Sequence, residues 1–294
     1  MKLCAWLALA SLTASAAIVK DVRTAIAAND FATGAQLIKA YRMTNGVTPE
    51  MLEALSWMAR GELAVRNYGQ AEKYASETYQ LCTAELKKRP LDQERGLPIA
   101  LGAAIEVEAN YLAAQHRRAE AVTYLQDQLK LFRATSINAR IQKNINLLTM
   151  EGKPAPALQK VALPKGKPVL LFFWAHWCGD CKAEGPILAQ LQSEFKGLAI
   201  VAPTQKYGYV QGGEEAAPEV ELRYIDKIRK ERYADIIADP APVSEVNFLR
   251  YGVSTTPTLV LVDRNGIVRL YHPGRMTYEE LRPLVAALFK SNAS

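Results

Sequence analysis

Two cysteines, Cys178 and Cys181, are separated by two residues, a spacing used both for reversible disulfides and for half of a zinc site. A zinc site would need a second pair of Cys or His side chains at ligand spacing. The sequence has three His, and its two other cysteines are the widely separated Cys4 and Cys82, so such a pair is missing. We therefore expect thiol-disulfide chemistry at this pair and no bound metal.

The cysteine pair follows an apolar run at residues 169–174 and opens a helical stretch. At a helix N-terminus, unpaired backbone N–H groups and the helix dipole favour a negative charge. We expect Cys178 to be the exposed thiolate nucleophile and Cys181, one turn into the helix, to be the more buried resolving thiol. Asp180 beside them is expected to raise the thiol pKa, which favours electron donation; the alternative is a fully solvated side chain without effect.

Composition changes once along the chain. Residues 20–148 are rich in Ala, Leu, Gln, Glu and Arg, with almost no β-branched runs, which is typical of helices. Residues 151–156 contain a Gly and two Pro and are expected to be a linker. Short apolar runs then alternate with helical stretches, as in α/β domains. We expect an all-α domain over residues 17–150 and an α/β domain over residues 151–294.

The helical half contains a weak internal repeat. Similar segments begin at Asn29, Arg66 and Arg117, and residues 61–74 resemble a tetratricopeptide repeat. An irregular antiparallel bundle is the alternative, and both give an all-α domain. Cys82 shares a helix face with neighbouring apolar residues, so we expect it to be buried and inert.

The segment at 173–182, Phe-Trp-Ala-His-Trp-Cys-Gly-Asp-Cys-Lys, resembles the active site of thioredoxins. Residues 153–290 as a whole resemble the TlpA/ResA-like thiol-disulfide reductases. Further motifs at fitting separations carry this resemblance: Pro-Ala-Pro at 154–156, Cys-Lys-Ala-Glu-Gly-Pro at 181–186 and Gly-Val-Ser-Thr-Thr-Pro-Thr at 252–258. The resemblance implies a thioredoxin-fold α/β domain, which follows the helical-repeat or bundle domain expected from composition.

The resemblance also implies roles for single residues. Trp177 would contact substrate beside the nucleophile. In this fold Pro257 is cis and faces the cysteine pair, and the backbone of Thr256 pairs with an extended substrate segment. Glu184, three residues after the resolving cysteine, would accept that cysteine's proton. Thioredoxins carry a buried Asp where this chain has Phe172, so that proton acceptor is missing.

The first residues resemble a secretory signal. Lys2 gives a short basic start, residues 3–12 are apolar, and Ala-Ser-Ala at 14–16 fits the small-x-small cleavage rule. We expect a signal peptide over residues 1–16 and a periplasmic or secreted protein. An uncleaved N-terminal anchor is the alternative.

Charge and motifs argue against two classes of ligand. The 36 Lys and Arg and the 30 Asp and Glu give a net charge of +6 that is spread thinly, without the basic block typical of nucleic-acid binding. The sequence has no G-x-G-x-x-G or Walker pattern for a nucleotide. We therefore expect no nucleic-acid partner and no cofactor.

These patterns predict an exported disulfide reductase that acts on disulfide-containing proteins or extended cysteine peptides. An external electron donor must recharge it, and in the family this is usually a membrane thiol transporter. A protein partner for the helical domain is a further expectation. The segment 205–242 is an insertion relative to a minimal thioredoxin, and we expect it to border the active site.

Three alternatives to the reductase remain open. An oxidase or isomerase would use the same fold and cysteines and differ only in redox potential. A redoxin-type peroxidase is disfavoured because residues 175–178 read Ala-His-Trp-Cys, whereas that group uses Thr-x-x-Cys. The third is a helical-repeat binding module with an accessory thioredoxin domain.

Overall fold

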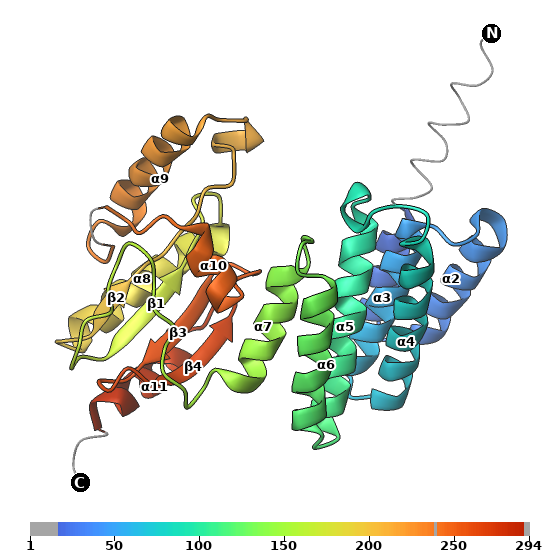
Figure 1. Cartoon of the computed structure of the whole chain (residues 1–294), viewed down its shortest axis with the longest axis horizontal. Helices are drawn as coiled ribbons and strands as arrows, with labels where there is room; N and C mark the ends of the chain where they lie inside the picture. The colour runs from blue at the N-terminus through green and yellow to red at the C-terminus, as the bar shows by residue number, and fades with distance from the viewer. Residues whose placement is uncertain (1–16, 238–239, 291–294) are drawn as a thin grey trace. The chain divides into compact units, whose positions relative to one another are not determined.

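The computed structural model describes residues 17–237 and 240–290, so the expected signal peptide at residues 1–16 lies outside the described residues. The chain divides between Ile141 and Gln142 into two compact units. The first is helical and the second is an α/β unit (Figure 1). This order confirms the fold class expected from the sequence.

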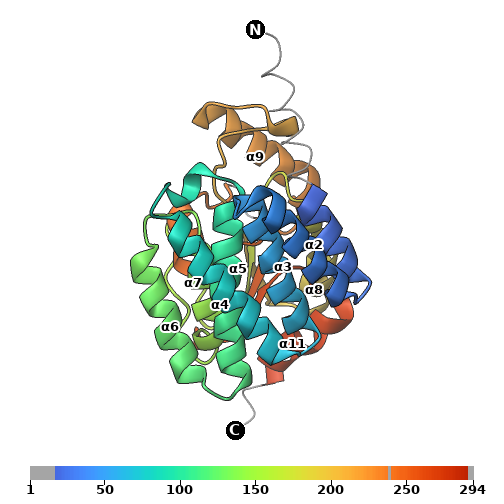
Figure 2. The same cartoon turned by 90° about the vertical axis from the view of Figure 1, so that its right-hand side faces the viewer.

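The helical unit consists of helices joined by short turns (Figure 2). Residues 17–27 form the first described helix. It is followed by α2 (Phe31–Asn45), α3 (Pro49–Ala64), α4 (Tyr68–Glu85), the 3-10 turn η1 (Leu91–Gln93), α5 (Gly96–Ala114) and α6 (Arg118–Leu131). Helix α7 (Asn138–Thr149) contains the division between the two units.

Helix α5 is the central helix of this unit. It packs against α3, α4 and α6. Among the described residues it is the one helix long and apolar enough to cross a membrane by length and composition, and 56% of that window is buried inside the protein. Its first residue, Gly96, allows a close approach to α3, because a Cβ there would lie 2.8 Å from the Pro49 carbonyl oxygen.

Three turns of the helical unit share one backbone geometry. Asn29, Arg66 and His116 have φ angles of 61°, 62° and 60°. The residue after each one donates its N–H to the carbonyl five positions earlier, at 2.9, 2.8 and 2.9 Å. This is the Schellman arrangement that ends a helix. The three turns coincide with the weak internal repeat of the sequence, whereas the tetratricopeptide assignment stays a prediction.

The α/β unit contains a four-stranded sheet in the order β2-β1-β3-β4. Strand β1 pairs parallel to β2 and antiparallel to β3, and β3 pairs antiparallel to β4. The strands are β1 (Val169–Phe173), β2 (Ala199–Val201), β3 (Thr258–Val262) and β4 (Val268–Pro273). The other elements are α8 (Gly179–Glu194), η2 (Gln211–Gly213), α9 (Pro218–Tyr233), α10 (Glu245–Tyr251) and α11 (Tyr278–Lys290).

Strand β1 is buried on both faces, which explains its unbroken apolar run. Leu170 and Phe172 face a core shared with α8, α9 and α11. Val169, Leu171 and Phe173 face a second core shared with α10. The strand is thereby fixed in the middle of the unit, and the residues that follow its C-terminal end are held firmly.

The end of α7 packs with the α/β unit. A Cβ on Gly252 would lie 2.5 Å from the backbone nitrogen of Lys143, so only glycine permits this approach, and its φ of 61° also favours glycine. Met150 belongs to the core formed with α10. The two units therefore divide at residues 141–142, before the domain boundary expected at residue 150. The expected domain boundary stays a prediction.

The segment expected to be a linker, residues 151–156, instead pairs with β4 and the turn before it. Gly152 donates its N–H to the carbonyl of Val268, and Ala155 donates to that of Gly266, both at 2.8 Å. The Pro and Gly residues of this segment end α7. The segment is nonetheless held in place, because its backbone N–H groups bond to carbonyl groups of β4 and of the turn before it.

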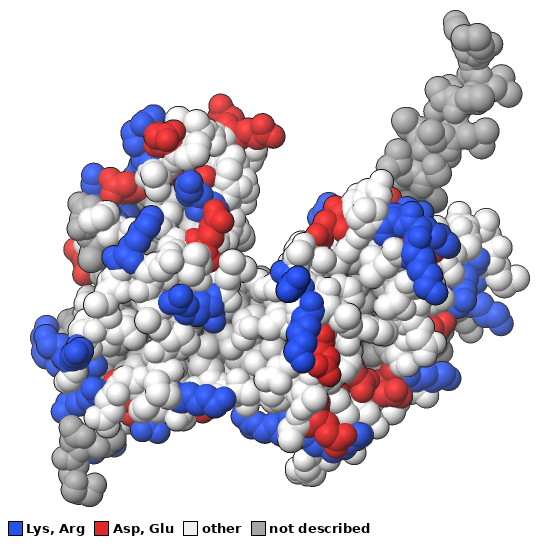
Figure 3. All heavy atoms as spheres, in the orientation of Figure 1, with Lys and Arg blue, Asp and Glu red and all other residues white. Residues whose placement is uncertain are grey.

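Charged side chains are mixed on the surface. On the face shown in Figure 3, Lys and Arg lie among Asp and Glu. Some form exposed ion pairs, such as Arg117–Glu120 at 2.7 Å and Lys130–Asp127 at 2.9 Å. This pattern supports the expectation of no nucleic-acid partner, which stays a prediction.

Candidate active site

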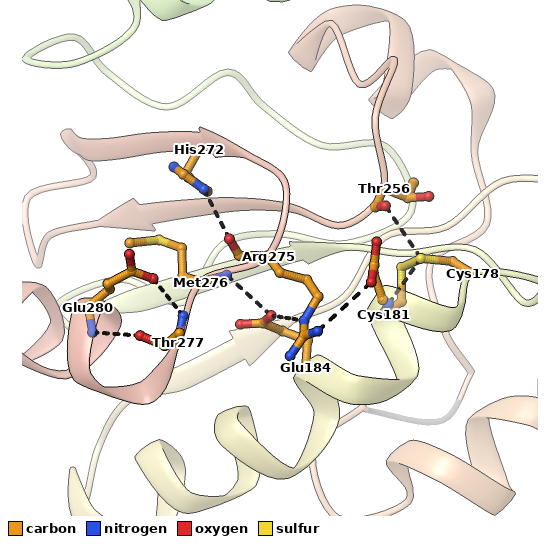
Figure 4. A network of polar contacts seen from close by, with 10 residues as sticks. Cys178, Cys181, Glu184, Thr256, His272, Arg275, Met276, Thr277 and Glu280 are labelled. Atoms are coloured by element: carbon orange, nitrogen blue, oxygen red, sulfur yellow. Dashed lines mark hydrogen bonds and ion pairs between the residues drawn. A yellow bond between two sulfur atoms is a disulfide. The ribbon is translucent and has the colours of Figure 1, made fainter. Parts of the chain in front are cut away.

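The cysteine pair lies where β1 leads into α8, and Cys178 and Cys181 form a disulfide. Cys178 is the N-cap residue of α8, and the N–H of Cys181 points at its sulfur from 3.0 Å (Figure 4). Such a backbone donor favours a negative charge on the sulfur. When the disulfide is reduced, this geometry stabilises the Cys178 thiolate.

Both sulfurs are nearly hidden in the oxidised protein. Cys178 is 3% exposed and Cys181 is fully buried. Cys178 is therefore the more exposed of the two cysteines, as expected, but it is far less exposed than the sequence led us to expect. The reason is the loop above it: the Thr256 carbonyl oxygen lies 3.4 Å from the Cys178 sulfur (Figure 4). The bond between Thr256 and Pro257 is cis, as the family resemblance implied.

Trp177 lies at the edge of this buried pair and is 47% exposed. Its ring contacts Tyr207 edge to face, with ring centroids 5.4 Å apart. An exposed indole beside a hidden disulfide offers apolar contact surface to a substrate. Its expected role in substrate binding fits this placement and stays a prediction.

Glu184 is buried below the cysteine pair, one turn after Cys181 on α8. Its Oε2 accepts the N–H of Met276 at 3.4 Å and lies 3.8 Å from Nε of Arg275, whereas its Oε1 has no hydrogen-bond partner among the described residues (Figure 4). Burial raises the pKa of Glu184 to about 7, against the lowering effect of these two neighbours. The side chain can therefore take up or release a proton near neutral pH.

Arg275 also approaches Asp180, with 3.9 Å between Nη1 and Oδ1. The Asp180 side chain is 69% exposed, so water screens its charge. These observations favour the solvated alternative for Asp180, and its effect on the thiol pKa stays a prediction.

Phe172 occupies the position where thioredoxins carry a buried Asp. It is fully buried, and its ring packs edge to face on Tyr233 with centroids 5.7 Å apart. This strand position thus supplies no proton acceptor, and Glu184 is the buried carboxylate that α8 brings close to the pair.

His176, for which no role was expected, lies in the site. Its side chain is fully buried, and its Nε2 lies 3.1 Å from Oε1 of Glu221 in α9. Burial lowers the pKa of His176, so the ring is neutral and Nε2 donates to the carboxylate. A signal was available in the sequence, because a polar residue inside an otherwise apolar run needs a polar partner.

The expected insertion between residues 205 and 242 contains η2 and α9. It leaves and re-enters the unit at neighbouring points, since Thr204 donates to the Pro242 carbonyl at 3.0 Å and Ser244 donates to that of Thr204 at 2.8 Å. Through Tyr207 and Glu221 it contacts residues next to Cys178. The expectation that it borders the active site is therefore correct.

Cys82 on α4 takes no part in this site. It is fully buried and unpaired, and burial raises the pKa of its thiol to about 12. This fits the inert thiol expected from the sequence. Among the described residues, no group of three or more His, Cys, Asp or Glu could hold a metal ion.

The differences in burial among the three cysteines predict how fast their thiols react. In the reduced native protein, iodoacetamide should modify Cys178 much faster than Cys181 or Cys82, because Cys178 has a stabilised thiolate and a small exposed fraction, whereas the other two cysteines are fully buried. Mass spectrometry of alkylated peptides over time measures the three rates. Alkylation of Cys82 as fast as Cys178 at pH 7 would contradict the buried position of Cys82.

Comparison with known proteins places residues 156–289 in a thioredoxin-like domain family. The thioredoxin-like protein YneN of Bacillus subtilis is 30% identical over 139 residues, which cover 47% of this chain and 72% of YneN. The thiol:disulfide interchange protein DsbE of Escherichia coli is 30% identical over 140 residues, 45% of this chain and 65% of DsbE. The thiol-disulfide oxidoreductase ResA of Geobacillus thermodenitrificans is 29% identical over 124 residues, 40% of this chain and 61% of ResA.

Proposed function

Since the chain belongs, through its C-terminal half, to the thioredoxin-like thiol-disulfide oxidoreductases of the DsbE/ResA type, we propose that it is an exported disulfide reductase. The observation that carries the proposal is the buried Glu184 beside a Cys178–Cys181 disulfide at a helix N-terminus. The proposed substrates are disulfide-containing proteins or extended cysteine peptides. The expected signal peptide supports a periplasmic or secreted location.

The reaction begins from the dithiol form. The Cys178 thiolate attacks one sulfur of a substrate disulfide, which forms a mixed disulfide and expels the first substrate thiolate. Cys181 then loses its proton, attacks the Cys178 sulfur and expels the second substrate thiolate. Two electrons pass to the substrate, each substrate thiolate takes up a proton, and the protein is left with its disulfide. An external reductant, which we propose to be a membrane thiol transporter, must then restore the dithiol.

Glu184 fits the second half of this reaction. A carboxylate with a pKa of about 7 can accept the Cys181 proton at neutral pH, when this buried thiol must ionise. The strand below offers no alternative, because Phe172 stands at the usual place of the acid.

The loop at Thr256 fits substrate capture. Its carbonyl oxygen faces the Cys178 sulfur at 3.4 Å, so an extended substrate segment that pairs with this backbone would bring its own sulfur to the nucleophile. Trp177, which directly precedes Cys178 in the chain, would then contact the same substrate segment.

The direction of electron flow is tested by the reduction potential of the Cys178–Cys181 pair. The thiolate lies at the N-terminus of α8, and its nearest charged neighbour in sequence is the acidic Asp180. A weakly stabilised thiolate makes a better reductant. We expect a potential of about −270 mV, the value of thioredoxin, and not the −120 mV of the oxidant DsbA.

Equilibration with glutathione redox buffers, acid trapping and mass measurement give this potential. A value above about −180 mV, the level of protein disulfide isomerase, would contradict the reductase and favour the oxidase or isomerase. About 30 mV corresponds to 1.4 kcal/mol for a two-electron couple, so the potentials expected for a reductase and for an oxidase or isomerase are well separated.

A further inference from the structure

A single buried carboxylate links the insertion to the redox-active segment. Glu221, in the first turn of α9, is 1% exposed at its side chain, and its partner His176 is fully buried. His176 lies two residues before Cys178 in the chain. A buried carboxylate is costly unless hydrogen bonds compensate for the lost water, so this contact has to be well satisfied.

The other partners of Glu221 come from the start of the insertion. Besides His176, the carboxylate accepts the backbone N–H of Tyr207 at 2.5 Å and that of Gly208 at 2.9 Å. One side chain on α9 therefore holds both the segment before Trp177 and the first loop of the insertion. Loss of its acceptor atoms would leave the buried His176 donor and two backbone N–H groups of the insertion without this partner.

Aromatic rings fill the space around this contact. The His176 ring lies edge to face against Tyr207, Tyr209 and Tyr224, with centroids 5.7, 5.6 and 5.3 Å away. Tyr207 also contacts the exposed Trp177 ring. A continuous aromatic surface thus runs from the insertion to the residue next to the nucleophile.

This surface adjoins a hollow in the insertion. The hollow is open, has a volume of about 540 Å³, and is lined by Tyr207, Gly208, Tyr209, Gly213 and Glu215, together with two alanines. Its tyrosines are the same rings that contact His176. The two tyrosine rings supply aromatic contact surface beside the polar atoms of this lining.

We propose that Glu221 and His176 are positioning residues that hold the insertion beside the disulfide, so that Trp177, Tyr207 and Tyr209 bind an aromatic or large apolar side chain next to the substrate's cysteine. The inference rests on the proposed function and names a substrate class for it. Because Cys178 is only 3% exposed, a polypeptide must be held close to react, and this surface supplies the contact that holds it.

The test uses two peptides that differ only in the residue before a single cysteine, Phe or Ser, each joined to thionitrobenzoate through a mixed disulfide. Attack by the reduced protein releases coloured thionitrobenzoate or free peptide thiol, and both products are quantified. We expect the wild type to show about tenfold higher kcat/KM for the Phe peptide, mainly through a lower KM. Equal values for the two peptides would overturn the inference.

Glu221→Gln is the central variant, because it keeps the shape of the side chain but puts an amide donor among backbone donors. We expect it to lose most of the preference for the Phe peptide over the Ser peptide. The control is Glu219→Gln on the same turn of α9, where the side chain is exposed. Retention of the full preference in Glu221→Gln would contradict the positioning role.

Two further measurements keep the test decisive. Limited trypsin digestion should cut after Lys206 faster in Glu221→Gln than in Glu219→Gln, because the insertion is no longer held. If Glu221→Gln does not fold, Tyr209→Ala, which leaves the carboxylate intact, should still lower the preference for Phe. A wild type that reduces neither peptide would refute the proposed function itself, whereas equal reduction of both refutes only this inference.

Discussion

Cys178→Ser should abolish disulfide reduction, with a loss of about 10⁴-fold or more, as expected when the sole nucleophile of an enzyme is removed. A serine hydroxyl at this N-cap stays protonated at neutral pH and cannot replace the thiolate. Insulin reduction measured with a chemical reductant as donor gives the rate. Substantial turnover by this variant would contradict the assignment of Cys178 as nucleophile.

Cys181→Ser is the matched variant and should behave differently. It keeps the nucleophile but lacks the thiol that resolves the mixed disulfide, so adducts should accumulate on Cys178. Mass spectrometry after acid trapping identifies them. Adducts found mainly on Cys181 in the Cys178→Ser protein would reverse the two roles.

The second large effect concerns Glu184→Gln. Removal of a general base typically costs about 10²-fold or more, so resolution of the mixed disulfide should slow by that order. In the wild type this step should accelerate as the pH rises through about 7, where Glu184 ionises. The variant should lose that inflection and follow the ionisation of the thiol itself at higher pH.

Rapid-quench measurement of the mixed disulfide between pH 5 and 9 separates these outcomes. Glu194→Gln, on the same helix but paired with Arg282 and Tyr278, is the control and should match the wild type. An inflection near pH 7 that persists in Glu184→Gln would show that another group accepts the proton.

The same carboxylate should also affect stability. Its folded pKa of about 7 lies above the ordinary value of 4.5, so the folded state holds the proton more tightly than the unfolded chain. Ionisation therefore costs stability as the pH rises from about 4.5 through 7. Glu184→Gln should raise Tm at pH 8 and have a smaller effect at pH 4.5, which calorimetry can measure.

Much of this site could be predicted from sequence because its parts are local or belong to ordered motifs. The strand, the C-x-x-C pair and the start of α8 are contiguous, and the resemblance located Pro257 and Glu184. The near-complete burial of Cys178 was not predictable from local sequence, since it depends on a loop 78 residues away. The contact between His176 and Glu221 spans 45 residues and follows from how the insertion folds back.

The turns of the helical half show the same limit. The residues around Asn29, Arg66 and His116 look only loosely alike, because a left-handed turn conformation does not require glycine and leaves a weak sequence signal. The hydrogen bonds of the three turns are nonetheless alike. The division of the two units within α7 has a different reason, since the packing of the end of α7 against Gly252 joins positions far apart in the chain.

The pairing of residues 152–155 with β4 has a consequence for solubility. An edge strand with free N–H and C=O groups can add a strand from another molecule and so start aggregation. Here Val268 both accepts from Gly152 and donates to the Lys153 carbonyl at 2.9 Å, which occupies the beginning of that edge. A fragment designed to start after residue 156 would expose these groups and should be prone to self-association, whereas one that retains α7 keeps them covered.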